Sequence, residues 1–327
     1  MSTLKIDGLK NNGSAIDLPN GIKVGGKEIV QGYTSSGTEP ASPAKGDFWW
    51  DSTNEELYQY MNGEFKAIET VVRVLDIADF SYDSVSFGIG SQDGSALGFA
   101  FSTDGTKMYV SGTATDRIHQ YTLTTAFDLS TASYDSVSFL YGSNNSGVAF
   151  KDDGTKMYIT GYSTDDIKQY TLSTAFDVST ASYDSVSLSV SSQDTAPYDL
   201  TFSFDGTKMY LSGGQLKRIH QYSLSTAWDL STASYDSVYL NASVECPNLY
   251  GVTFSKDGLQ LFAVCASNQY IQQYSLTTAF DLSTASLGGT FSTPNLFTSG
   301  IFLSADQEKI YVLASNTDAV YQYSTNF

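Results

Sequence analysis

Side chains that could catalyse a reaction stand at isolated positions in this sequence. Hydrolysis of a glycosidic bond needs a pair of Asp or Glu residues flanking that bond. Asp199 is the one carboxylate at the start of five equivalent strand-like segments, and the other four have glycine there: Gly98, Gly147, Gly251 and Gly300. Since one carboxylate makes no acid–base pair, we expect Asp199 to accept hydrogen bonds from loop amides, and we predict no catalytic residues and no enzymatic activity.

Metal and cofactor sites are not indicated either. Four polar residues occupy equivalent positions in successive segments of the chain: His119, Lys168, His220 and Gln272. We expect these to be polar strand residues, too far apart for a nucleophile–base pair or a metal cluster. The acidic pair Asp152 and Asp153 lacks the D-x-D-x-D-G spacing of a calcium loop, and no phosphate-binding or dinucleotide fingerprint occurs. The sequence therefore predicts no metal and no cofactor.

The two cysteines permit two interpretations. Cys246 precedes the first strand of the fourth repeat, and Cys265 ends its second strand. Those positions are neighbours across an antiparallel pair, so a disulfide is geometrically possible. Two buried free thiols are equally compatible with a protein made in the cytoplasm.

These residues are positioned by an internal repeat. The six residues Asp-Gly-Thr-Lys-Met-Tyr begin at 104, 153 and 205, and altered copies begin at 257 and 306. A Gln-Tyr pair keeps the same spacing of 49–52 residues, at 120, 169, 221, 273 and 322. Self-similarity at a period of about 50 residues indicates a propeller or a repeat array.

Each repeat is predicted to form four short strands. In the first repeat these are 97–102, 106–112, 117–123 and 133–139, with a turn at 103–105 and a longer connection at 124–131. Asp and Gly suit the turn, because Asp can cap it and Gly tolerates a positive φ. Four antiparallel strands in about 50 residues make one propeller blade. We expect Asp-Gly to turn the chain and the Met and Tyr to pack between blades.

The ends of the repeat predict how the ring closes. A fourth-strand sequence occurs at Phe80–Phe87, before the first complete repeat, and the last repeat stops after its third strand. We therefore predict an all-β fold with a five-bladed β-propeller over residues 71–327. Phe80–Phe87 would supply the outer strand of the fifth blade, which leaves no open seam.

Loop variability predicts which face could bind a ligand. The turns between first and second strands, and the third-to-fourth connections, are nearly identical in all repeats, so we expect that face to be a scaffold. The loops on the opposite face differ, and loops on a rigid scaffold commonly bind ligands; simple sequence drift is the alternative. Aromatic, amide and hydroxyl groups there suit a sugar ring. The candidate binding residues are Tyr141, Asn144, Asn145, Tyr162, Gln193, Tyr198, Asp199, Asn248, Tyr250, Asn295 and Phe297.

Charge and hydropathy exclude some partners. The net charge is −18 and the pI is about 4.2. So acidic a chain should repel phosphate backbones and anionic lipid, and we predict no nucleic-acid partner. No signal peptide is recognisable at the N-terminus, and no apolar run approaches the length of a membrane span, so we predict no membrane insertion.

Residues 1–70 lie outside the repeat. Residues 1–32 are predicted to form short strands with Asn-Gly and Gly-Gly turns, and residues 33–45 an extended Ser/Pro/Gly-rich linker. Residues 46–68 are predicted to form a three-stranded meander that starts at Gly-Asp-Phe-Trp-Trp-Asp. A β-segment this short buries little core of its own. We therefore expect it to oligomerise, most simply as a trimer, or to dock onto another chain.

This N-terminal pattern resembles a small module of bacteriophage virion proteins, especially tail fibres and tail-associated proteins of marine phages. The matching residues are Pro40, Pro43, Gly46 to Asp51, Leu57, Tyr58, Tyr60, Asn62, Gly63 and Phe65. The repeats, with F-S-x-D-G-T-K-M-Y-V, are similar to a propeller repeat of phage and bacterial proteins. The resemblance implies a non-enzymatic virion protein, assembled in the bacterial cytoplasm, and it supplies no binding residues.

The function that we expect is a tail-fibre or receptor-binding protein. Residues 1–70 would attach to other virion proteins, and the propeller would be displayed towards a host-surface glycan. Two alternatives remain: a decoration protein or head fibre of the capsid, and a free-standing lectin like the five-bladed lectins of the tachylectin type. Those lectins repeat their binding loop in each blade, whereas the loops here differ.

Overall fold

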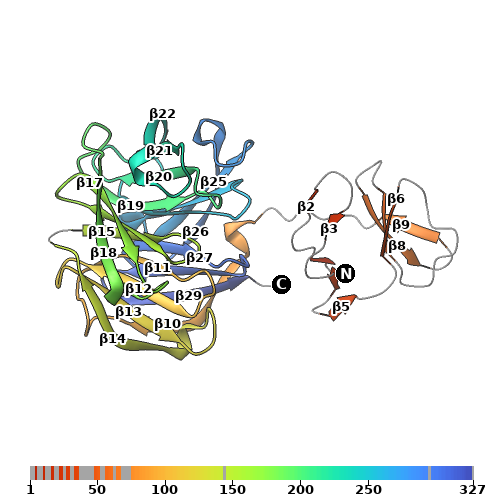
Figure 1. Cartoon of the computed structure of the whole chain (residues 1–327), viewed down its shortest axis with the longest axis horizontal. Coiled ribbons are helices and arrows are strands. Elements are labelled where there is room, and N and C mark those ends of the chain that lie inside the picture. The colour runs from red at the N-terminus through yellow and green to blue at the C-terminus, as the bar shows by residue number, and fades with distance from the viewer. Residues whose placement is uncertain are drawn as a thin grey trace. The chain divides into compact units, whose positions relative to one another are not determined.

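The computed structural model of the chain divides into two compact units, Met1–Val74 and Leu75–Phe327. It describes residues 75–142, 145–293 and 296–325, apart from the side chains of residues 145 and 267, and the backbone of nine short strands within residues 1–74. Figure 1 shows the ribbon of both units. None of the helices in these described ranges has both the length and the apolar character that crossing a bilayer requires.

The strands of the N-terminal unit form three small sheets. One sheet contains β1 (Leu4–Lys5), β4 (Ile22–Val24) and β5 (Lys27–Ile29), and a second contains β2 (Lys10–Asn11) and β3 (Ile16–Asp17). The third contains β6 (Tyr33–Ser36), β7 (Phe48–Asp51), β8 (Glu56–Met61) and β9 (Glu64–Ala67). Strands β7 to β9 are the expected meander. The segment expected to be only a linker contributes β6, which pairs with β7 in parallel.

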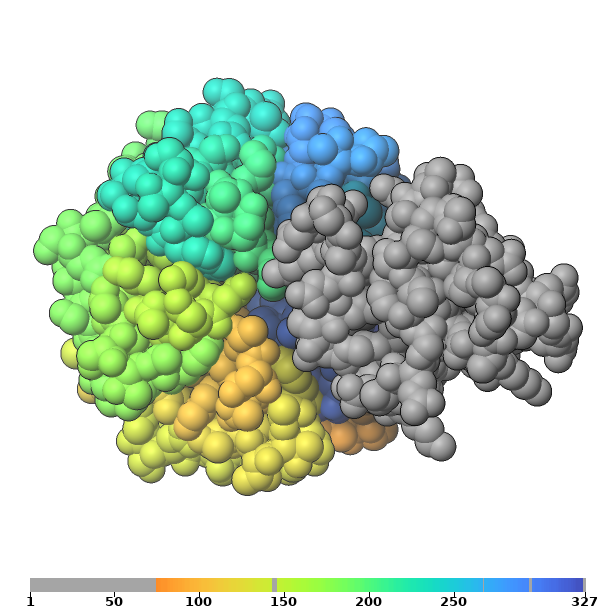
Figure 2. All heavy atoms as spheres, turned by 45° about the vertical axis from the view of Figure 1, so that its right-hand side comes forward, coloured from red at the N-terminus to blue at the C-terminus, as the bar shows by residue number. Residues whose placement is uncertain are grey.

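The C-terminal unit is a five-bladed propeller, as the repeat predicts, and Figure 2 shows the blades following one another around the ring by colour. The first blade contains β11 (Ala96–Phe101), β12 (Lys107–Gly112), β13 (Arg117–Leu123) and β14 (Ala132–Leu140). The second contains β15 (Asn145–Phe150), β16 (Lys156–Gly161), β17 (Asp166–Leu172) and β18 (Ala181–Ser189). The third contains β19 (Pro197–Phe202), β20 (Lys208–Gly213), β21 (Arg218–Leu224) and β22 (Ala233–Asn241).

The fourth blade contains β23 (Leu249–Phe254), β24 (Gln260–Cys265), β25 (Tyr270–Leu276) and β26 (Ala285–Ser292). The fifth contains β27 (Thr298–Leu303), β28 (Lys309–Ala314) and β29 (Ala319–Thr325), and β10 (Phe80–Gly88) completes it. In every blade the first strand lies at the ring's axis and the fourth at its rim. In the first blade the predicted strand ends differ from the observed ones by at most one residue, and the ends of β13 agree with the prediction.

The ring closes as predicted, with β10 antiparallel to β29 from Phe80 opposite Thr325 to Gly88 opposite Ala319, and with a β-bulge between Tyr82 and Val85. The closing segment is longer than expected. Short 3-10 helices precede the outer strand of every blade: η1 (Ile77–Asp79), η2 (Leu129–Thr131), η3 (Val178–Thr180), η4 (Leu230–Thr232) and η6 (Leu282–Thr284). Because η1 belongs to the fifth blade, closure begins at Leu75 and not at Phe80.

The Gln of the repeated Gln-Tyr pair joins neighbouring blades. Gln120 accepts a hydrogen bond from the Val178 amide of the next blade (3.0 Å) and donates one to Asp135 of its own blade (2.9 Å). At the seam, Gln273 accepts one from the Ile77 amide at 2.8 Å. Each 3-10 helix is thus fastened to the preceding blade by one amide side chain.

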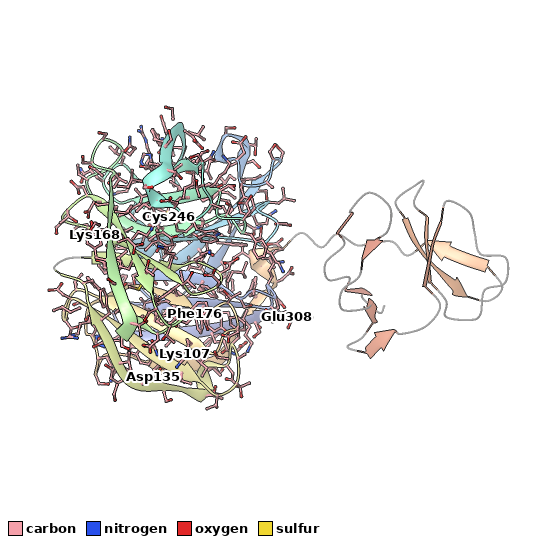
Figure 3. All side chains as sticks on the ribbon, viewed as in Figure 1. Lys107, Asp135, Lys168, Phe176, Cys246 and Glu308 are labelled. Carbon is pink, nitrogen blue, oxygen red and sulfur yellow. A yellow bond between two sulfur atoms is a disulfide. The ribbon has the colours of Figure 1, made fainter. Side chains whose placement is uncertain are left out.

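The Asp-Gly-Thr-Lys-Met-Tyr hairpin is structural, as expected. Gly105 has a φ of 70°, and the Lys107 ammonium forms an ion pair with Asp135 of the outer strand at 2.9 Å (Figure 3). Tyr109 donates a hydrogen bond to the Phe176 carbonyl oxygen of the next blade (2.6 Å), and Met108 packs in the cluster shared with the preceding blade. Five such apolar clusters lie in the described propeller, and they are its core.

Candidate functional site

The two faces of the ring are composed as predicted. On one face the Phe127 amide of a third-to-fourth connection donates to the Gly105 carbonyl oxygen of a first turn at 3.0 Å. On the other face the Thr113 amide donates to the Ser95 carbonyl oxygen at 3.0 Å, which joins the two kinds of variable loop. We call the first face the turn face and the second the variable face.

Carboxylates fasten the variable loops in two blades. Asp93 accepts hydrogen bonds from the amides of Ser95 and Thr115, each at 2.9 Å, and Asp194 accepts equivalent ones from Ala196 and Leu216. Cys246 stands at this position in the fourth blade and forms a disulfide with Cys265. Of the two interpretations left open by the sequence, the structure therefore has the disulfide, which joins the same two segments covalently.

A stack of tyrosines brings three predicted binding residues together on the variable face. The ring of Tyr198 at the start of β19 lies 5.2 Å from that of Tyr162 and 4.2 Å from that of Tyr250, measured between centroids. Burial and the neighbouring hydroxyls of Tyr250 and Tyr162 raise the pKa of Tyr198 well above its usual value. Tyr162 is 37% exposed, so one end of the stack is open to solvent. An aromatic platform with neighbouring hydroxyls can stack on the apolar face of a sugar ring.

The other predicted residues of this face lie apart from the stack. Tyr141 is 7% exposed and donates its hydroxyl hydrogen to the Gly112 carbonyl oxygen at 2.9 Å, so little of it can meet a ligand. Gln193 accepts a hydrogen bond from Tyr222 (3.3 Å), Asn248 is half-buried, and Phe297 is 47% exposed. Asn144, Asn295 and the side chain of Asn145 lie outside the described residues.

Several exposed apolar side chains lie at the variable face. They come from its loops and from the end of β14: Leu140, Tyr162, Leu216, Val244 and Phe297. Other exposed apolar side chains lie elsewhere, such as Phe204 on the turn face and Tyr183 on an outer strand. A ligand bound at the variable face would cover part of its apolar surface.

His119 and His220 are both buried, and their positions differ in one contact. The Nε2 atom of His119 lies 2.9 Å from the Thr115 hydroxyl, but Leu216 replaces that threonine in the third blade, so His220 Nε2 has no hydrogen-bond partner among the described residues. Burial lowers the pKa of His220 to about 4, against a smaller opposing effect of Asp194.

Stability is expected to fall in acid because of His220. Its folded pKa of about 4 lies below the unfolded value of about 6.5, so the unfolded state binds a proton first and stability is lost as the pH falls from 6.5 towards 4. Urea titrations at pH 7.5 and 4.5 give the decrease in the free energy of unfolding between the two pH values. We expect this decrease to be smaller by about 1–3 kcal/mol in His220→Gln than in the wild type. Gln is the residue of the fourth blade at this slot, Gln272. An unchanged pH slope in the variant would exclude this origin.

The narrowest part of the axis is built from glycine and one carboxylate. A Cβ on Gly98 would stand 2.4 Å from the Ser146 carbonyl oxygen, and one on Gly147 would stand 2.8 Å from the Asp199 Cα. Asp199 is 7% exposed, and its Oδ2 accepts a hydrogen bond from the Val252 amide at 3.0 Å. The amides that Asp199 binds belong to strands of the inner ring, not to loops. Burial raises the pKa of Asp199 to about 7.

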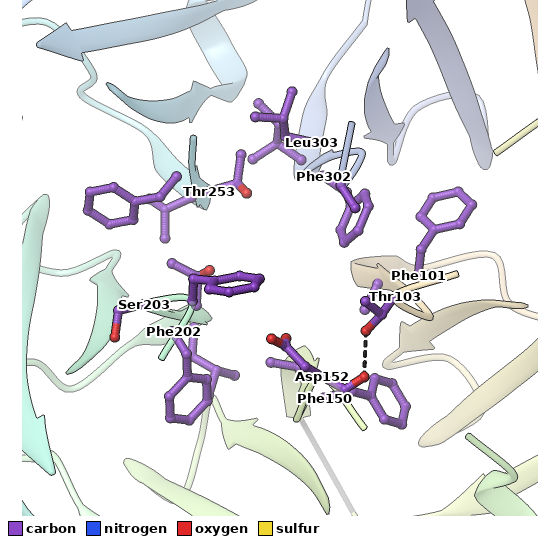
Figure 4. A pocket seen from close by; sticks show the side chains of 18 of the residues that line it. Phe101, Thr103, Phe150, Asp152, Phe202, Ser203, Thr253, Phe302 and Leu303 are labelled. Carbon is purple, nitrogen blue, oxygen red and sulfur yellow. Dashed lines mark hydrogen bonds between the residues drawn. The ribbon is translucent and has the colours of Figure 1, made fainter. Parts of the chain in front are cut away.

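An apolar cavity of about 370 Å³ extends from Asp199 along the axis to the turn face. Figure 4 shows the side chains of several blades around its central opening, with Thr103 donating to the Asp152 carbonyl oxygen at 2.7 Å. Its walls come from the ends of the first strands: Phe101, Phe150, Phe202, Phe254 and Leu303. We call this space the axial cavity; it opens on the face that was expected to be only a scaffold.

The sequence contained a sign of the axial cavity that the loop comparison missed. This turn reads Phe-Ser-x-Asp-Gly in three blades, Phe-Lys-x-Asp-Gly in the second and Leu-Ser-x-Asp-Gln in the fifth, and its x position differs in every blade: Thr103, Asp152, Phe204, Lys256 and Ala305. All five are exposed and line the mouth of the cavity. One variable position inside an otherwise nearly uniform turn thus marks the cavity mouth.

No protein-family model matches the sequence, and no curated protein matches it significantly. Among solved structures, a "putative 6-phosphogluconolactonase" from Bacteroides uniformis aligns with a TM-score of 0.47 and 15% identity, over 69% of this chain and 65% of that one. A functionally unknown protein from Desulfotomaculum acetoxidans aligns with a TM-score of 0.44 and 12% identity, over 79% and 72%. Likenesses this distant carry no argument about activity.

Proposed function

We propose that the protein is a non-enzymatic component of a bacteriophage virion, a tail fibre or tail-associated receptor-binding protein. In this proposal residues 1–70 attach the chain to other virion proteins, as a trimer, and the propeller is displayed towards the host surface. The observation that carries the binding role is the tyrosine stack on the variable face.

The N-terminal unit supports the attachment role. Its resemblance to virion modules covers the Gly-Asp-Phe-Trp-Trp-Asp stretch and the strands β7 to β9. The remaining strands of this unit are two to four residues long, and sheets that small need a partner surface to be stable. Assembly of several copies, or docking onto the particle, would supply that surface.

The propeller supports the display role. Its blades are joined at all five interfaces by the glutamine side chains and at four of them by a tyrosine hydrogen bond as well, so the ring is a rigid support. The variable face places the tyrosine stack and the exposed apolar loops on this support. A sugar ring stacked on Tyr162 would have the Tyr198 hydroxyl within the same cluster.

Immunogold electron microscopy of the purified particle tests the virion role, with an antibody raised against residues 75–327. Label at the tail tip or fibres supports the proposal. Label over the head would instead indicate a decoration protein or head fibre, and absence of label from all particles would favour a free-standing lectin.

Substitution of Tyr162 is expected to weaken glycan binding strongly. Stacking on an exposed aromatic ring supplies much of the affinity for a sugar, so Tyr162→Ala should weaken binding on a glycan array by about tenfold or more. Tyr183→Ala is the matched control, because Tyr183 is similarly exposed at 45% but lies on the outer strand β18. Equal loss in both variants, or no loss in Tyr162→Ala, would contradict a site at the stack.

A further inference from the structure

The axial cavity has the dimensions of a small-molecule site. Its volume of about 370 Å³ falls within the usual range for ligand pockets. Its wall residues run from Asp199 to Phe202 along β19 and on to Ser203, and four residues of extended chain span about 13 Å. A ligand that fills it would be elongated, with an apolar body along the apolar lining of the cavity.

The floor of the axial cavity is a single buried carboxylate. The sister blades have glycine at this position, so Asp199 breaks the symmetry of the ring and is the one side chain there that extends beyond the backbone. Its oxygens accept hydrogen bonds from the amides of Val252 and Leu200. Within the described part of the chain, the hydrogen-bond donors to Asp199 are backbone amides and not cationic side chains. Burial of a carboxylate is costly unless a cation pairs with it.

The mouth of the axial cavity has one acidic and one basic side chain, whereas its floor has a carboxylate alone. Among the residues that line the cavity, three are charged: Asp152 and Lys256 at the mouth, and Asp199 at the floor. The Lys256 ammonium lies over the Phe204 ring, 5.4 Å from its centroid, so this cation stays at the mouth. The floor carboxylate therefore lacks a counter-ion from the cavity's own lining.

We propose that the axial cavity binds a small organic cation, an ammonium group on an unbranched or aromatic apolar body, with the ammonium against Asp199. The ammonium would supply the missing counter-charge and complete the hydrogen bonding of the carboxylate. The predominantly apolar lining of the cavity accommodates the apolar body of the ligand. The net charge of −18 would also draw cations towards the protein.

This site is distinct from the tyrosine stack. The axial cavity opens on the turn face, whereas Tyr162 belongs to the variable face, and the cavity ends at Asp199. The test of the ammonium site is therefore independent of the proposed glycan binding and of the virion role.

Calorimetric titration of the full chain tests the proposal, with 4-phenylbutylammonium as the probe and the neutral 4-phenylbutan-1-ol as its isostere. We expect the ammonium to bind with a Kd on the order of 100 µM and the alcohol to bind about tenfold more weakly. Asp199→Asn keeps the shape of the side chain and an oxygen acceptor but removes the charge. It should weaken ammonium binding by about tenfold or more and leave the alcohol nearly unchanged.

A variant at the cavity mouth locates the site. Ala305→Phe should weaken binding of both compounds, and it uses a residue that the ring already accepts, because the third blade has Phe204 at the equivalent position. Thermal unfolding of each variant shows that it is folded. The proposal is overturned if the folded wild-type chain binds no ammonium, if Asp199→Asn binds it equally well, or if Ala305→Phe leaves binding intact.

Discussion

A chain that begins at Leu75 is expected to unfold cooperatively, whereas a chain that begins at Ile89 is expected not to fold. The two differ only in the segment that closes the ring, η1 and β10. This segment buries Leu75, Ile77 and Phe80, at about 1.5–3 kcal/mol for a large apolar side chain. It also supplies the whole partner of β29. The loss is comparable with the total stability of a typical domain, about 5–15 kcal/mol.

Circular dichroism and thermal unfolding of both shortened chains check this expectation. Without β10, strand β29 becomes an open edge, and Asp83 no longer accepts hydrogen bonds from Gln322 and Ser324. Exposed edges pair with other chains, so we also expect aggregation of the shorter chain in size-exclusion chromatography. If the chain from Ile89 melted at the same temperature as the chain from Leu75, closure by β10 would not be what stabilises the ring.

The period of the repeat was sufficient to predict the fold, because each blade repeats the same local chemistry. Three features together define a closed ring: the Asp-Gly turns, the Met and Tyr that pack between blades, and a fourth-strand sequence that lies before the first complete repeat. The closing strand was predicted, but the short helix η1 before it was not, since η1 has Asp76-Ile77-Ala78-Asp79 where the first blade has Asp128-Leu129-Ser130-Thr131. Only the Asp cap and one buried apolar residue are shared, and these are too few to recognise by similarity.

The candidate site was predictable only in part. Sequence comparison located Tyr162, Tyr198 and Tyr250 on one face, but it could not show that their rings stack, because they come from three different blades or loops. It also could not distinguish Tyr141, whose hydroxyl is bonded within the fold, from an exposed tyrosine. The disulfide was undecided because Cys246 replaces an aspartate that has the same role, and that equivalence becomes visible only when the loops are superposed.

Substitution of an inner-ring glycine is the second change that we expect to have a large effect on stability. The structure gives the reason for glycine at these positions: at Gly98 a side chain would meet the Ser146 carbonyl oxygen and the Gly147 Cα, both backbone atoms. A side chain could move away from an added methyl group, but neighbouring first strands can separate only if the whole ring expands. The blades are tied to each other at each interface, so expansion is costly.

Gly98→Ala is therefore expected to destabilise the propeller by about 3 kcal/mol or more, measured by urea unfolding of the full chain. Gly88→Ala is the matched control, since a Cβ there meets no atom within 4 Å, and its effect should stay within about 0.5 kcal/mol. Equal stability of Gly98→Ala and the wild type would mean that the ring can widen. A ring that cannot widen keeps Asp199 as a fixed floor, so the axial cavity and the tyrosine stack remain separate sites at opposite ends of one axis.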